Sequence, residues 1–161
     1  MTTTTIAPAT LIQRPFDLAL IAFFGLAIAY GLLISLPEAL GFPVAPDSPW
    51  PPLRSLYDWA VAQEPGHLDP SPILLANAVF DGFIQAPALI VICFGLAKLR
   101  PWVIPLGLFY AGAAIVNTLG YFVQTFLGPH PPLDLSVYLP FNLPWLIAPA
   151  LLAMRLWAGR L

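Results

Sequence analysis

Three polar residues spaced by four interrupt the apolar segment 73–97: Asn77, Asp81 and Gln85. In a helix they fall on one face, one above the other. An ionised carboxylate inside a bilayer costs several kcal/mol unless it is paired or hydrated, and acids in membrane segments usually mark functional sites. The same segment contains no Lys or Arg. We therefore predict Asp81, the one acid we expect to be buried, as the countercharge of a ligand or as an acid–base group.

Two later apolar segments carry polar side chains at a matching depth. Segment 102–126 has its polar residues in its second half, and segment 137–157 has them in its first half. If these segments are antiparallel helices, both sets lie in the half of the membrane that holds Asp81, and polar side chains in hydrocarbon turn inward toward one another. With a tyrosine from the first apolar segment, the predicted ligand-binding residues are Tyr30, Asn77, Asp81, Gln85, Asn117, Thr118, Tyr121, Asn142 and Trp145.

A purely structural role is the alternative for several of these residues. Amides and hydroxyls hold membrane bundles together by hydrogen bonds between helices, which applies to Asn117, Thr118 and Gln124. A Trp near a membrane boundary is often an interfacial anchor, which applies to Trp145. Both readings remain open from the sequence.

The elements that must position these residues are four apolar segments, 18–36, 73–97, 102–126 and 137–157, in a chain that is 59% hydrophobic and only 9% charged. Soluble domains carry roughly 25% charged residues, and a membrane-spanning helix needs about 20 apolar residues. We predict an all-α integral membrane four-helix bundle, formed by one domain over residues 16–158 after a polar tail, 1–15. The tail lacks the pattern of a cleavable signal, so we expect the first helix to stay in the protein.

A proline-rich connection, 37–72, joins the first two segments, and Pro37 is predicted to end the first helix. Within it, residues 53–63 have an amphipathic helical pattern, which predicts a short helix over the mouth of the bundle. His67 and His130 stand beside prolines in loops, so we expect them to be solvated and assign them no role.

Five of the six basic residues fall on one side of this topology, which by the positive-inside rule places both termini in the cytoplasm; they are Arg14, Lys98, Arg100, Arg155 and Arg160. The connection 37–72 is then extracytoplasmic, and the cavity lies in the outer or lumenal half. A net charge of −2 gives no footprint for nucleic acid. With Cys93 as the single cysteine and no metal-binding or nucleotide motif, we expect no metal and no cofactor.

The order of motifs resembles the EXPERA family, which includes emopamil-binding protein (a sterol isomerase of the endoplasmic reticulum) and the sigma-2 receptor. FDGFIQAP, with Asp81, Gln85 and Pro87, resembles a segment of the sigma-2 receptor that has glutamate in place of Asp81. NLPWLIAP, with Asn142 and Trp145, resembles the Asn/Trp segment of emopamil-binding protein. IVNTLGYF is similar to that enzyme's third span, but has Thr118 where the enzyme carries an acid. The resemblance covers about residues 16–156.

The resemblance implies a hydrophobic cavity that binds sterols and cationic amphiphilic amines. In the enzyme members, a carboxylic acid protonates a ring double bond and a basic group removes a proton from a neighbouring carbon. By that resemblance Asp81 is the acid or countercharge, Trp145 the aromatic wall that stabilises a cation, and Asn142 an orienting amide. The expected partners are the lipid bilayer and a sterol-like lipid or cationic amphiphile. The membrane is that of the endoplasmic reticulum or a bacterial inner membrane.

Our first interpretation is binding of a sterol-like or isoprenoid lipid, or of a lipophilic amine, with its cation or hydroxyl at Asp81. The alternative is a sterol-type double-bond isomerase, for which Asp81 is the predicted catalytic residue. The isomerase pattern has a His and a Glu on the first helix, whereas this helix offers Tyr30 and Ser35. Isomerase chemistry therefore requires Tyr121 or a residue of the long connection as second titratable group.

Two further interpretations complete the set. The bundle could be a non-catalytic scaffold or trafficking partner of another membrane protein. A channel is disfavoured, because the polar stripes stop at mid-membrane. Small residues at Gly107 and 111–114 would let a neighbouring helix approach closely, which is compatible with a homodimer.

Overall fold

The computed structural model describes residues 10–158, which form helices and loops and contain no strand. Four helices are long and apolar enough to cross a membrane: Pro15–Ala39, Pro72–Ala97, Val103–Leu127 and Leu135–Trp157. The predicted all-α membrane bundle is thus confirmed. Residues 1–9 of the predicted tail and Arg160 lie outside the described residues.

The first two membrane helices are each built of three parts. The first comprises α1 (Pro15–Tyr30), a π-helical stretch (Gly31–Ser35) and α2 (Leu36–Ala39). The second comprises α4 (Pro72–Val79), a π-helical stretch (Phe80–Gln85) and α5 (Ala86–Ala97). The third and fourth are α6 (Val103–Leu127) and α7 (Leu135–Trp157). Short 3₁₀ turns cover Leu11–Gln13 and Pro65–Leu68.

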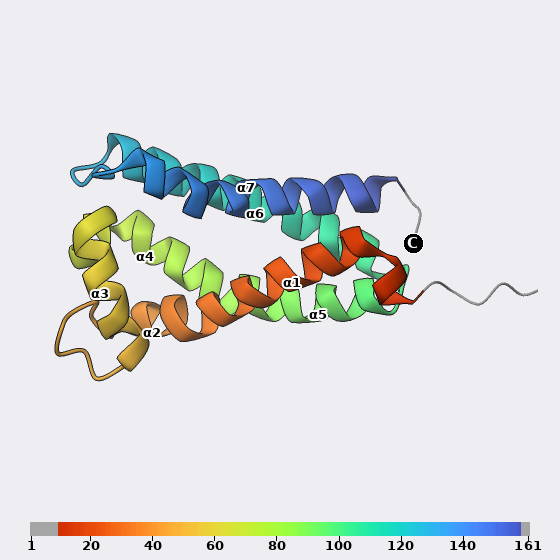
Figure 1. Ribbon diagram of the computed structural model, residues 1–161, viewed down its shortest axis with the longest axis horizontal. Helices are drawn as coiled ribbons and strands as arrows, with labels where there is room; N and C mark the ends of the chain where they lie inside the picture. Colours follow the sequence, from red (N-terminus) through yellow and green to blue (C-terminus); the bar gives the residue numbers. More distant parts are fainter. Residues whose placement is uncertain (1–9, 159–161) are drawn as a thin grey trace, which may run out of the picture.

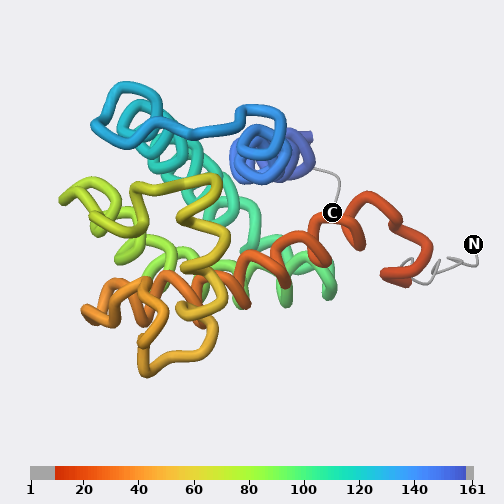
Figure 2. Tube along the Cα trace, turned by 60° about the vertical axis from the view of Figure 1, so that its left-hand side comes forward, coloured from red at the N-terminus to blue at the C-terminus, as the bar shows by residue number. Residues whose placement is uncertain are grey.

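The helices form two layers, in which α6 lies along α7 and α1 lies along α5 (Figure 1). Residues 10 and 158 are at one end of the bundle, and the segment 40–71 closes the other, which we call the loop end. Helix α3 (Pro51–Gln63) lies across the loop end, at a large angle to the membrane helices. Figure 2 shows the same segment turned toward the viewer. A helix was predicted here from its amphipathic pattern over residues 53–63.

The two π-helical stretches face each other at a close approach of the first two membrane helices. A Cβ added to Gly31 would lie 2.8 Å from the carbonyl oxygen of Asp81, and one added to Gly82 would lie 2.8 Å from the Cα of Leu36. Only glycine therefore fits at either position without a backbone shift. π-helical turns inside α-helices are frequent at functional sites, and this pair aligns Asp81 with the end of the first helix.

The first helix ends later than predicted, at Ala39, and passes through Pro37. A proline at this position cannot donate a hydrogen bond to the carbonyl of Leu33, four residues earlier. The Trp50 indole N–H donates to that carbonyl instead, at 2.5 Å. The loop thus supplies the missing donor, and the extra helical turn carries Glu38, which the sequence placed in the connection.

The close-packed core lies at the end opposite the loops. Buried apolar side chains from all four membrane helices meet there; they include Leu20, Phe24, Leu89, Ile92, Val103, Leu152 and Leu156. A small second cluster consists of Leu53 and Ala60 on the buried face of α3 and Val44 of the preceding loop. One of the predicted small residues of α6 lies against α7 of the same chain, because a Cβ added to Gly107 would clash with Leu156, whereas a Cβ added to Gly112 meets nothing within 4 Å. The homodimer stays a prediction.

An ionic cluster ties three of the membrane helices together beside this core. Asp17 is 2% exposed and accepts hydrogen bonds from Arg155 Nε at 2.7 Å and from Arg14 Nη1 at 2.8 Å. Arg14 also donates to the carbonyl oxygens of Leu96 and Ala97, at the end of α5. Asp17 was not predicted as a buried group, and its burial corrects the expectation that Asp81 is the one buried acid.

Candidate ligand-binding site

A cavity of about 420 Å³ lies at the loop end, between the membrane helices and the cap formed by α3 and residues 64–67. Pockets for drug-sized ligands range from roughly 300 to 1,000 Å³. All nine residues predicted from the sequence line this cavity. Their part in ligand binding stays a prediction, but their shared depth on four helices is now a feature of the structure.

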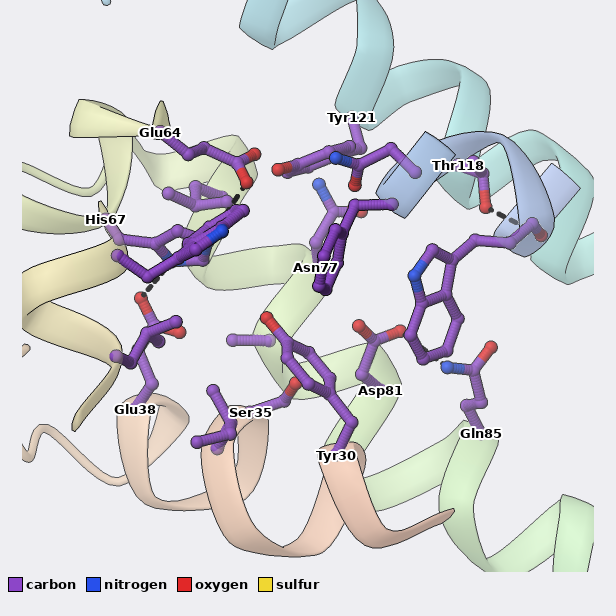
Figure 3. A pocket seen from close by; sticks show the side chains of 18 of the residues that line it. Tyr30, Ser35, Glu38, Glu64, His67, Asn77, Asp81, Gln85, Thr118 and Tyr121 are labelled. Carbon is purple, nitrogen blue, oxygen red and sulfur yellow. Dashed lines mark hydrogen bonds and ion pairs between the residues drawn. The ribbon is translucent and has the colours of Figure 1, made fainter. Parts of the chain in front are cut away.

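Asp81 stands on one side of the cavity with Gln85 (Figure 3). The amide Nε2 of Gln85 donates to Asp81 Oδ1 at 3.1 Å, and the Tyr110 hydroxyl donates to Gln85 Oε1 at 3.0 Å. Gln85 and Tyr110 are both 5% exposed. This chain of hydrogen bonds fixes the orientation of the Asp81 carboxyl group from behind and leaves its other face toward the cavity. Tyr110 was not predicted, because it precedes Asn117, the first of the predicted polar residues of α6, by about two helical turns.

A second polar group lies on the other side of the cavity, where Figure 3 shows Glu38, Glu64 and His67. His67 Nδ1 lies 3.2 Å from Glu38 Oε1, and His67 Nε2 lies 3.8 Å from Glu64 Oε2. All three side chains are 6% exposed or less. The imidazole therefore bridges two buried carboxyl groups, one from the end of the first membrane helix and one from the loop before α4.

Burial and mutual charge shift the titration of the two loop residues. Burial raises the pKa of Glu64 to about 7; His67 opposes the shift and the charge of Glu38 adds to it. For His67 burial alone lowers the pKa, but the hydrogen bond to Glu38 and the charges of Glu38 and Glu64 outweigh it, so that the pKa is raised. Glu64 thus titrates near neutral pH at the wall of the cavity, and its two acidic neighbours favour the protonated form of His67.

The sequence-based prediction that His67 is solvated is wrong, and Glu38 and Glu64 join Asp17 as buried acids that it missed. His130 is partly exposed, with its Nε2 3.5 Å from Asp69 Oδ2. The one local signal was the spacing of Tyr30 and Glu38, eight residues apart and so on one helical face. Nothing local to residues 64–67 indicates that they fold back over the bundle.

Two of the predicted residues also donate hydrogen bonds to backbone carbonyl groups. Pro149 cannot donate to the carbonyl of Trp145, and the Thr118 hydroxyl donates to that oxygen at 3.5 Å. Asn142 Nδ2 donates to the carbonyl of Tyr138 at 3.0 Å. The hydrogen bond between Thr118 and the carbonyl of Trp145 therefore supports the structural role considered for Thr118, although this side chain lines the cavity as well.

Aromatic rings form the wall beside Asp81. The Trp145 ring lies 5.5 Å from the ring of Tyr30 and 5.6 Å from that of Phe23, centroid to centroid. Trp145 is thus packed between helices at the cavity. Electron-rich ring faces of Trp and Tyr attract cations, so the aromatic and acidic parts of the wall favour the same kind of ligand.

The charges that line the cavity are unbalanced. Among the described residues, the lining contains three carboxyl groups, those of Glu38, Glu64 and Asp81, and one imidazole, but no Lys or Arg. No group of three or more His, Cys, Asp and Glu side chains within residues 10–158 is arranged to hold a metal ion. The geometry therefore suits an apolar body that carries a cation or a hydrogen-bond donor.

The comparison with known families agrees with this architecture. Residues 50–156, more than half of the chain, match the sequence model of EXPERA, the expanded EBP superfamily. The chain belongs to the EXPERA family. No curated protein and no solved structure matches it. The matched part of this EXPERA protein contains Asp81, Glu64 and His67, whereas Tyr30 and Glu38 precede it.

Proposed function

We propose that this EXPERA protein binds a lipophilic ammonium or a sterol-like or isoprenoid lipid in the cavity, with the cation or hydroxyl at Asp81. The observation that carries the proposal is the lining: a mostly apolar cavity to which residues 10–158 contribute three carboxyl groups and no Lys or Arg. A cation placed beside Asp81 satisfies a carboxylate that is costly to leave alone in a membrane. Trp145 and Tyr30 add an aromatic face to the same position.

The test is equilibrium binding of a radiolabelled cationic amphiphile to the detergent-purified protein and to its Asp81→Asn variant. Two unit charges 4 Å apart interact by about 4 kcal/mol at an effective dielectric constant of 20, so we expect the affinity to fall at least about 100-fold. Asp47→Asn is the matched control, because Asp47 is exposed and does not line the cavity. Equal affinity of Asp81→Asn and wild type would overturn the proposal and favour a scaffold or partner-binding bundle.

A double-bond isomerase is the second candidate, and the structure adds a specific argument for it. The sequence left Tyr121 or a residue of the connection 37–72 as the second titratable group, and Glu38, His67 and Glu64 of that connection line the same cavity as Asp81. Protonation of a ring double bond by a carboxylic acid gives a carbocation, and loss of a proton from a neighbouring carbon to a base gives the isomer. The sterol gains one proton and loses another, so no further reactant is needed.

Isomerase activity is tested by incubating the purified protein with a sterol that has a ring double bond and separating the isomers by gas chromatography with mass spectrometry. Conversion by wild type that is lost in Asp81→Asn supports the enzyme. Saturable binding of the sterol without conversion excludes this chemistry for that substrate and leaves the binding function intact.

We further propose that the loop end faces away from the cytoplasm, as the positive-inside rule predicts. Arg14, Lys98, Arg100 and Arg155 all lie at the ends of helices remote from the loop end. A cysteine introduced at the exposed position 47 should react with an impermeant maleimide added outside intact cells, or inside the lumen of vesicles. Labelling only from the cytoplasmic side would reverse the orientation.

A further inference from the structure

A second, smaller cavity adjoins the ligand cavity at Glu64. Its volume is about 30 Å³, and its wall shares Glu64, Leu74 and Tyr121 with the larger one. Glu64 is 4% exposed and comes from the loop after α3. One carboxyl group therefore forms part of the boundary between a largely apolar cavity and a second space behind it.

The lining of the second cavity is suited to water. Ser71, Gln124, Thr125 and His130 contribute polar side chains, and a buried water needs about 10 to 15 Å³ of such space and two to four polar partners. The cavity has room for one or two waters by this measure. It reaches toward the surface at the contact between His130 and Asp69, whose side chain is 87% exposed. The second cavity thus connects Glu64 with the aqueous phase at the loop end.

The two oxygens of Glu64 have different surroundings. Oε2 faces His67 Nε2 at 3.8 Å, whereas Oε1 is buried and has no hydrogen-bond partner among the described residues. A buried carboxyl oxygen without a partner costs free energy comparable to a lost hydrogen bond. A water in the second cavity, whose wall includes Glu64, would supply the donor that this oxygen lacks.

We propose that Glu64 exchanges its proton with the aqueous phase at the loop end through water in the second cavity, and so sets the charge of the ligand cavity. The consequence for ligands rests on the function proposed above. The step is a transfer of one proton from the Glu64 carboxyl group to water and back, and no other bond changes. The groups that face or act on Glu64 are His67 in the cap, Tyr30, Glu38, Asp81, Tyr121 and Tyr138 on the membrane helices, and Asp69 and His130 at the outer mouth.

The titration range fits this role. Because burial raises its pKa to about 7, Glu64 is ionised above and protonated below neutral pH. The ionised form adds a negative charge to the cavity wall and favours a bound ammonium, and the protonated form removes that charge. His67, whose pKa is raised, gains a positive charge when it is protonated, which also disfavours a bound ammonium, so its variant belongs in the same experiment.

The first test needs no ligand. Infrared difference spectra of the protein in lipid nanodiscs should show a protonated carboxyl band that titrates near pH 7, disappears in Glu64→Gln, and shifts promptly on transfer to D₂O. Thr125→Leu, which fills the second cavity, should slow that shift at least about tenfold, and Gly66→Ala is a milder filling variant because a Cβ there meets only Leu74 at 3.9 Å. An unchanged exchange rate in folded filling variants, or a band that survives Glu64→Gln, would overturn the proposal.

The second test uses a quaternary ammonium amphiphile, whose own charge does not change with pH. Two unit charges about 10 Å apart at an effective dielectric constant of 20 change an affinity by about tenfold. The affinity should fall by about that factor from about pH 8 to about pH 6. In Glu64→Gln the step should shrink to the part that His67 contributes, whereas it should persist in His130→Gln and, with altered size, in His67→Gln. A step that persists unchanged in Glu64→Gln overturns the assignment. Loss of all binding at every pH would overturn the proposed function instead, and the infrared test would still decide the role of Glu64.

Discussion

Replacing Asp17 by asparagine should destabilise the protein while leaving the ligand cavity intact. Asp17 is 2% exposed and accepts hydrogen bonds from Arg155 Nε, from Arg155 Nη2 at 3.1 Å and from Arg14 Nη1. Asparagine keeps the volume but offers one acceptor oxygen and turns an amide donor toward a guanidinium. The change therefore removes the carboxylate that joins Arg14 to Arg155 in this cluster.

The magnitude follows from the burial of the pair. Removing one partner of a buried ion pair costs about 3–5 kcal/mol, and we expect the lower end, because Arg14 keeps its bonds to the carbonyls of Leu96 and Ala97. For a chain of this size about 1 kcal/mol corresponds to about 2–4 °C. The melting temperature should therefore fall by about 6–12 °C.

The assay is thermal unfolding in detergent, followed by far-ultraviolet circular dichroism, with Asp47→Asn as the exposed control. Below the melting temperature of the variant, its affinity for a cationic amphiphile should equal that of wild type, since the cavity lies at the opposite end of the bundle. A melting temperature within about 2 °C of wild type would refute the reasoning. So would a loss of affinity in protein that is still folded.

Three further predictions concern the cap, the glycine contact and the aromatic wall. Trp50→Phe should destabilise the protein by about 1–3 kcal/mol, because the Leu33 carbonyl loses its hydrogen-bond donor. In a double-mutant cycle of melting temperatures, Pro37→Ala should cancel most of that loss, since it restores a backbone donor. Purely additive effects would contradict the assigned hydrogen bond. Gly82→Ala should lower the melting temperature far more than Gly112→Ala, whose Cβ meets nothing within 4 Å. Equal effects would contradict the close contact between the first two membrane helices at Gly82. Trp145→Leu should weaken a quaternary ammonium by about 1–2 kcal/mol but spare its uncharged isostere in competition binding, whereas an equal loss for both would show a packing role only.

The four membrane helices and the nine cavity residues could be predicted because their signals are local. Apolar runs of sufficient length predict spans, and side chains spaced by four share a helical face whatever the rest of the chain does. Asn77, Asp81 and Gln85 show this most simply. Antiparallel order then brings the polar residues of successive helices to one depth.

The acids at the cavity wall could not be predicted in the same way, because their positions depend on tertiary contacts. Glu38 stays on the helix since Trp50 supplies the hydrogen-bond donor that Pro37 lacks. No pattern in the sequence predicts this contact between Trp50 and the helix. Glu64 and His67 belong to a proline-rich loop that normally lies in solvent. The bond between Asp17 and Arg155 joins residues 138 positions apart.

The electrostatics of the cavity link its two proposed features. Three carboxyl groups and one imidazole in a small apolar space cannot all be ionised without compensation, because like charges in low dielectric repel strongly. A proton on Glu64 and a cation beside Asp81 are two ways of supplying that compensation, and each makes the other less favourable. With the proposed water in the second cavity, the proton of Glu64 can leave when a cation arrives, whereas Asp81 is held by Gln85 and Tyr110 on the inner side of the cavity. A cavity that must accept a charged ligand from within a membrane therefore benefits from having one acid in contact with water and another away from it.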